Sequence, residues 1–169
     1  AFKTLDREFG IFFKKLFNGG EGTLVELEPE PETDEEGNVI EEAPEGAVAG
    51  IDIQATPPGK RFKSINLLSG GERALTSIAL ICAIMATNPS PFVVLDEVDA
   101  ALDESNSRKF ADIIDSLADK TQFVVVTHNR ATMMRANVLY GVTMGDDGVS
   151  QLLSVKLEDV EKIKQKQLA

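Results

Sequence analysis

One segment dictates how most of this chain must fold: Leu67-Leu68-Ser69-Gly70-Gly71-Glu72-Arg73. It is followed by a nearly continuous apolar run from Ala74 to Ala86. Ser69 and Glu72 have the S-x-x-E spacing of a capping box, in which the hydroxyl and the carboxylate each bind a backbone N–H of the first helical turn. The pattern therefore predicts a helix that begins here, and a plain cap explains both residues.

The adjacent Gly70 and Gly71 are not explained by a cap, because a glycine inside a helix costs about 1 kcal/mol relative to alanine. A helix N-terminus offers free N–H groups and a partial positive charge, and the lack of a Cβ atom lets an anion approach these donors closely. We therefore favour a phosphate-binding interpretation over a simple capped core helix.

The composition limits the classes of function. The chain has 169 residues, of which 43% are hydrophobic, and this suits one domain with a real core. Its net charge of -11 disfavours sequence-independent contact with DNA phosphates. The single cysteine, Cys82, lies in the apolar run, which predicts a core side chain in a reducing compartment. The sequence shows no signal peptide, and Ala74 to Ala86 is too short to span a bilayer, so we expect no membrane partner.

The N-terminal part reads as a helix followed by two strands. Residues 1–17 carry phenylalanine and leucine at helical spacing, and Asn18-Gly19-Gly20 predicts the end of that helix, which is compatible with the end of a coiled coil. Thr23 to Leu27 and Val48 to Ala55 are predicted strands. Between them, residues 28–46 are rich in Glu, Asp and Pro, which is typical of a solvated or disordered insertion.

Two apolar segments in the middle of the chain end in polar residues. Phe92 to Leu95 is followed by Asp96-Glu97, and Gln122 to Thr127 is followed by His128, the only histidine. Continuous apolar character predicts strands that are buried on both faces, and ligands bind beyond the carboxyl ends of such strands. Because helical segments alternate with these strands, we expect an α/β fold with a mostly parallel sheet flanked by helices.

The C-terminal part continues this pattern with shorter elements. Asn129 is a predicted cap of a short helix, and Val138 to Met144 is predicted to form a hairpin with Val149 to Val155. Residues 158–169 read as a closing polar helix.

The polar residues suit phosphate chemistry, but each has a simpler alternative. Asp96 is positioned for Mg²⁺, Glu97 for an attacking water, and His128 for a hydrogen bond to a terminal phosphate. Alternatively, Asp96-Glu97 is an acidic exit from the strand, His128 is structural, and Asp99 and Asp103 are turn and cap residues. The Walker A pattern G-x-x-x-x-G-K-[ST] fails at Gly59-Lys60, where Gln54 and Arg61 replace the required glycine and hydroxyl.

The order of these features resembles the ABC-type ATPases. Leu68-Ser69-Gly70-Gly71-Glu72 resembles the signature motif, Phe92 to Glu97 resembles Walker B, Val98 to Asp103 the D-loop, and Thr127-His128-Asn129 the H-loop. ABC transporters usually continue Walker B with Pro-Thr. Here Val98-Asp99 follows, and together with the Pro-Pro-Gly-Lys loop this is similar to the C-terminal half of the head domain of SMC (structural maintenance of chromosomes) proteins, especially bacterial ones. The resemblance covers about Gly50 to Val155.

The resemblance implies a particular architecture. Residues 18–157 would be the C-terminal lobe of an ABC-type P-loop NTPase head, residues 1–17 the end of a returning coiled coil, and residues 158–169 a C-terminal helix. Walker A would lie in an N-terminal lobe. The complete head would be an ATPase, whereas this chain alone would be inactive.

The resemblance also implies roles for individual residues, with ATP and Mg²⁺ as ligands. Asp96 would hold Mg²⁺, Glu97 would orient the hydrolytic water, and His128 would contact the γ-phosphate in the same head. ATP bound to the opposite head would meet the signature motif and the D-loop, through Leu68, Ser69, Gly70, Gly71, Glu72, Asp99, Ala100, Leu102 and Asp103.

The implied partners are the N-terminal lobe of the same head, a second SMC head in an ATP-dependent dimer, and the C-terminal winged-helix domain of a kleisin. DNA would be bound through the whole complex, in the cytoplasm at the nucleoid, during chromosome condensation and segregation. Two alternatives stay open. One is the head of a DNA-repair ATPase such as a RecN or RecF relative. The other is a non-enzymatic kleisin-docking module, for which the residues after Met144 are the expected surface.

Overall fold

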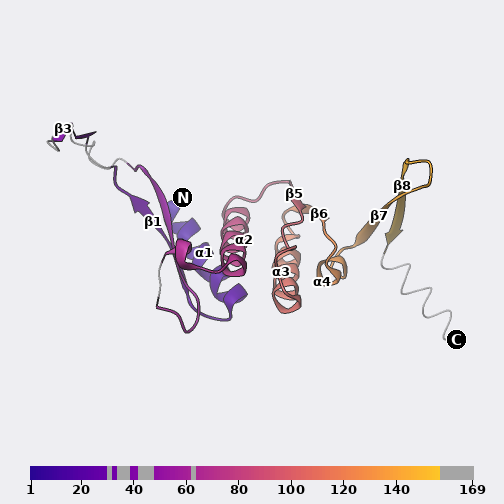
Figure 1. The fold of residues 1–169 in the computed structure, drawn as a ribbon, viewed down its shortest axis with the longest axis horizontal. Helices are drawn as coiled ribbons and strands as arrows, with labels where there is room; N and C mark the ends of the chain where they lie inside the picture. The colour runs from indigo at the N-terminus through magenta and orange to yellow at the C-terminus, as the bar shows by residue number, and fades with distance from the viewer. Residues whose placement is uncertain (30–31, 34–38, 42–47, 62–63, 157–169) are drawn as a thin grey trace. The chain divides into compact units, whose positions relative to one another are not determined.

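The computed structural model describes residues 1–29, 32–33, 39–41, 48–61 and 64–156. The chain divides into two compact units (Figure 1). The first unit comprises Ala1–Val93 and Leu117–Gln122, and the second comprises Val94–Ser116 and Phe123–Ala169.

The first unit begins with the predicted amphipathic helix, α1 (Phe2–Phe17). Its buried face consists of four apolar side chains, Phe9, Phe12, Phe13 and Leu16. The helix ends at Asn18, which adopts the left-handed conformation and donates its N–H to the Lys14 carbonyl. The predicted stop signal at this position is therefore confirmed.

Strands β1 (Glu21–Leu27) and β4 (Gly50–Thr56) pair antiparallel along their whole length, from Glu21 opposite Thr56 to Leu27 opposite Gly50. Both strands were predicted. Between them lies the acidic insertion, in which the structure describes a short antiparallel pair, β2 (Glu32–Thr33) and β3 (Val39–Glu41). The other residues of positions 30–47 lie outside the described part of the chain.

A 3₁₀ turn, η1 (Ile65–Leu67), leads into α2 (Gly70–Thr87), which packs against α1. Its buried side chains include Leu75, Ile78, Cys82 and Met85. By length and composition alone this helix could cross a membrane. Because it packs against α1 and buries one face in the first unit, it is the core helix that the sequence predicts.

Strands β5 (Phe92–Asp96) and β6 (Gln122–Val126) pair with each other. At one end the Gln122 N–H donates to the Pro91 carbonyl (3.0 Å), and at the other the Glu97 N–H donates to the Val126 carbonyl (2.9 Å). Because the two starts meet and the two ends meet, these strands run parallel.

The α/β class is confirmed, but two expectations about the sheet need correction. Among the described residues the strands form four separate pairs, and three of these are antiparallel. The strands β5 and β6 are also not covered on both faces, since the side chains that point to one face are exposed: Phe92 by 65%, Val94 by 58%, and Val124 and Val126 by 49% each. The prediction failed because a continuous apolar run does not show whether both faces of a strand are covered, and within the described residues one face is exposed.

The second unit contains α3 (Glu104–Leu117), the short α4 (Arg130–Met133), and the predicted hairpin of β7 (Val138–Met144) and β8 (Ser150–Lys156). Its core includes Leu95 and the apolar face of α3, namely Phe110, Ala111, Ile113 and Ile114. The hairpin pairs from Val138 opposite Lys156 to Met144 opposite Ser150. The predicted helix over residues 158–169 lies outside the described residues.

Candidate functional site

The signature-like segment of the first unit forms the predicted capping box. Ser69 is the N-cap of α2, and its hydroxyl accepts the Glu72 N–H at 3.4 Å. The Glu72 carboxylate in turn accepts the Ser69 N–H at 2.9 Å. Both backbone donors are satisfied by side chains, so the start of this core helix is fixed in position.

The two glycines behind the cap have no internal reason to be glycine. A Cβ atom at Gly70 or Gly71 would meet nothing within 4 Å, and neither residue has a positive φ. The N–H groups at these first helical positions have no acceptor within an α-helix. The chain therefore keeps exposed, unscreened donors at a helix N-terminus, at a cost in helix stability.

Lys60 forms an ion pair with this segment, and the sequence did not predict that contact. Its ammonium lies 2.8 Å from the Glu72 carboxylate, and this hydrogen bond, together with that from the Ser69 N–H, lowers the pKa of Glu72. The two residues are 12 positions apart in a loop and a helix, and no spacing rule connects them. In contrast, Leu68 is only 4% exposed, so its side chain belongs to the core and cannot contact a ligand.

In the second unit, Asp96 is the last residue of β5 and Glu97 follows it directly. Glu97 has φ of 51°, a left-handed conformation that is uncommon for a residue with a side chain. Its N–H binds the Val126 carbonyl and its own carbonyl accepts the Ala100 N–H at 3.1 Å, so a tight turn enforces this geometry. Backbone strain of this kind is concentrated at functional sites, which supports a special role for the Glu97 side chain.

The structure brings Glu97 and His128 together. The His128 Nδ1 atom lies 2.8 Å from a Glu97 carboxylate oxygen, and the side chains are 70% and 47% exposed, respectively. The two residues are 31 positions apart but follow adjacent parallel strands. The sequence predicted that each follows a strand, but not that the two side chains meet. Exposed groups of this kind, held by one mutual contact, are accessible to a substrate.

Asp96 is exposed at the carboxyl end of β5, and within the described ranges its carboxylate has no hydrogen-bond or ion-pair partner. The same residues contain no cluster of three or more metal-binding side chains. Magnesium retains several waters and is usually bound by one or two carboxylates together with substrate phosphates. A single carboxylate therefore fits a Mg²⁺ ion that arrives with a nucleotide.

The loop from Val98 to Asp103 contains both buried and exposed residues. Asp99 is only 1% exposed, and both its carboxylate oxygens accept hydrogen bonds from threonine hydroxyls within the second unit. Its side chain is thus engaged internally and is not open to a ligand. Ala100 and Asp103 are exposed and Leu102 is half-buried. Asp103 caps α3, since its carboxylate accepts the Asn106 N–H at 2.8 Å.

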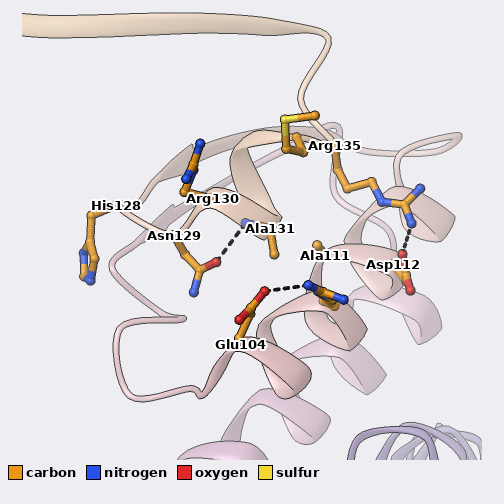
Figure 2. Close-up of a pocket in the computed structure, with 10 residues that line it drawn as sticks. Glu104, Ala111, Asp112, His128, Asn129, Arg130, Ala131 and Arg135 are labelled. Carbon is orange, nitrogen blue, oxygen red and sulfur yellow. Dashed lines mark hydrogen bonds and ion pairs between the residues drawn. The ribbon is translucent and has the colours of Figure 1, made fainter.

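A cavity of about 740 Å³ lies between α3 and α4, with His128 at one end and Arg135 at the other (Figure 2). Arg135 is paired with Asp112, and Arg108 with Glu104 (2.5 Å). The sequence did not predict this cavity, because its lining residues come from α3 and from residues 128–135 around α4, and β6 separates the two segments in the chain.

These features define an α/β fragment of an ABC-type ATPase head. A family model described as the RecF/RecN/SMC N terminal domain matches residues 12–151. The chromosome partition protein Smc of Lactiplantibacillus plantarum is 44% identical over 161 residues, which is 95% of this chain and 12% of that protein. The chain belongs to the SMC family.

Solved structures agree with this assignment. The Smc head domain of Pyrococcus furiosus, with an extended coiled coil and bound to the C-terminal domain of ScpA, matches with a TM-score of 0.81 and 36% identity, over 99% of this chain and 38% of that one. A structure from work on ATP-driven dimerisation and DNA-stimulated activation of SMC ATPases matches with a TM-score of 0.74 and 36% identity, over 99% of this chain and 93% of that one. The chain spans 12–13% of the length of the curated relatives that it matches.

Proposed function

We propose that this chain is the C-terminal lobe of an SMC ATPase head and forms one half of a composite ATP site. The other half would be a Walker A lobe of the same head, and a second head would bring the nucleotide that the signature segment contacts. The observation that carries this proposal is the pair Gly70 and Gly71, which the chain's own packing and backbone do not require. Bare backbone at a capped helix N-terminus suits close approach of a phosphate from another molecule.

The residues of the second unit would act on the terminal phosphate. Asp96 would hold the Mg²⁺ that accompanies ATP, and this ion would neutralise the charge that develops on the phosphate oxygens. The Glu97 carboxylate would orient the attacking water, and His128 would hydrogen-bond the γ-phosphate. The contact between Glu97 and His128 keeps both side chains at one point, as phosphoryl transfer requires, because this reaction depends on positioning and charge stabilisation.

This role predicts ATP-dependent engagement of two heads in chromosome condensation and segregation, in the cytoplasm at the nucleoid. In a head reconstituted from this chain and the Walker A lobe, Glu97→Gln should abolish phosphate release, while ATP-bound dimers should become long-lived. Turnover by this variant at the wild-type rate would exclude Glu97 as the residue that positions water.

A second role is docking of a kleisin, and the hairpin of the second unit favours it. Four large apolar side chains on one face of the β7–β8 hairpin are 64–71% exposed: Tyr140, Val142, Met144 and Leu152. Apolar patches of this kind mark interaction sites. Pull-down of a kleisin C-terminal winged-helix domain by this chain should be lost in Val142→Glu. If the variant still binds while it remains folded, the docking surface lies elsewhere.

A further inference from the structure

Among the residues that the structure describes, the buried carboxylate of Asp99 accepts side-chain hydrogen bonds from hydroxyl groups alone. Thr127 Oγ1 lies 2.9 and 2.8 Å from its two oxygens, and Thr132 Oγ1 lies 2.5 Å from one of them. No lysine, arginine or histidine in the described part of the chain pairs with Asp99. In these contacts the threonine hydroxyls donate and the carboxylate oxygens accept.

The residues on either side of His128 are fixed by this arrangement. Thr127, which precedes His128, is held by Asp99 and accepts the Asn129 N–H at 2.9 Å. Asn129, which follows His128, donates its side-chain N–H to the buried hydroxyl of Ser107 on α3 at 2.7 Å. Within the described ranges, the exposed imidazole of His128 makes one hydrogen bond, with Glu97. The direction of this imidazole therefore depends on the two anchored neighbours.

We propose that Thr132, on α4 and outside every recognised motif, is a positioning residue for the Glu97 and His128 pair. Its hydroxyl completes the set of donors around Asp99, and Asp99 in turn fixes Thr127 next to His128. Asp99 also lies two residues after Glu97, so one buried carboxylate links the loop that carries Glu97 with the loop that carries His128. The expected effect of Thr132 on kcat rests on the proposed ATPase function. Its expected effect on the orientation of the His128 imidazole does not.

The alternative is that Thr132 only stabilises the fold. Two conservative substitutions distinguish this structural role from the proposed positioning role. Thr132→Val keeps the shape of the side chain and removes the donor, whereas Thr132→Ser keeps the donor. In the reconstituted head, Thr132→Val should lower kcat roughly tenfold to a hundredfold with KM within about twofold, because small displacements of reacting groups carry penalties of this size. ATP-dependent head dimers should still form, and Thr132→Ser should stay within about threefold of wild type.

Proton NMR of the chain itself provides the second readout. His128 is the only histidine, so its imidazole signals are unambiguous. Thr132→Val should lose the nuclear Overhauser contacts between the imidazole and the Glu97 side chain, and Thr132→Ser should retain them. If Thr132→Val does not fold, Thr132→Ala replaces it, since alanine also removes the donor to Asp99 and favours the α4 helix.

The outcomes separate the two proposals. Wild-type kcat or unchanged imidazole contacts in a folded Thr132→Val would overturn the positioning role, as would an equal loss in Thr132→Ser. A wild-type head without ATPase activity would overturn the proposed function instead, and the NMR comparison would still decide the role of Thr132.

Discussion

Alanine at Gly71 should stabilise this protein and at the same time destroy its function. The new Cβ atom would meet nothing within 4 Å, and Gly71 does not have a positive φ. Alanine at this position therefore causes neither a steric clash nor backbone strain. Alanine is better than glycine in a helix by about 1 kcal/mol at interior positions, and by less in the first turn. We expect the free energy of unfolding to rise by about 0.5–1 kcal/mol, which raises the Tm of a chain of this size by about 1–4 °C.

The functional effect should have the opposite sign, because the same Cβ would occupy the space that a phosphate needs above the helix N-terminus. Light scattering of the reconstituted head with ATP, in a Glu97→Gln background, should show dimers that the added Gly71→Ala removes. Gly59→Ala is the matched control: it also has open space, but its φ of 78° makes alanine strained, so the Tm should fall. A lower Tm for Gly71→Ala, or unchanged ATP-dependent dimers, would refute this reasoning.

Three further predictions concern the same helix. Ser69→Arg should prevent dimerisation of the reconstituted head but leave ATP binding intact, and an unchanged dimer by light scattering would count against a contact with the other head. The hydrogen bonds from Lys60 and from the Ser69 N–H lower the pKa of Glu72 from its ordinary value of 4.5. The stability that the ionised Glu72 contributes to the fold is therefore present above pH 4.5 and is lost as the pH falls through the lowered pKa of the folded state. Denaturant unfolding of Glu72→Gln at pH 7 and pH 3 should therefore show a smaller acid loss than wild type, by up to about 1 kcal/mol for a partly exposed pair, and equal losses would exclude the ion pair. Burial raises the pKa of Cys82 to about 12, so a thiol reagent at pH 8 should react only in denaturant, and fast labelling of the native chain would contradict its place in the core.

Much of the local structure could be predicted from sequence because the signals are local. The capping box of Ser69 and Glu72, the stop at Asn18 and the cap at Asp103 each depend on residues within one helical turn. The position of Asp96-Glu97 and of His128 at the carboxyl ends of strands was also predictable from the apolar runs that precede them. The contact between Glu97 and His128 was not, because the sequence does not show which strands pair.

The rest depends on contacts that no periodicity encodes. Lys60 reaches Glu72 from a loop, and Thr132 reaches Asp99 across 33 positions. The exposed apolar side chains of β5 and β6 show a different limit, because an apolar residue in the sequence need not be buried by the chain that carries it. Asp99 is a further example. Its position in the D-loop-like segment suggested contact with a nucleotide, whereas its buried carboxylate accepts hydrogen bonds from hydroxyl groups inside the second unit.

Calorimetric titration of Mg-ATP tests most directly whether this chain is half of an ATP site. The chain alone should give no measurable binding at micromolar concentrations, since the signature segment and the residues around Asp96 supply no Walker A cradle for the phosphates. The reconstituted head should bind in the micromolar range. Micromolar affinity of the chain alone, equal to that of the head, would contradict the half-site account.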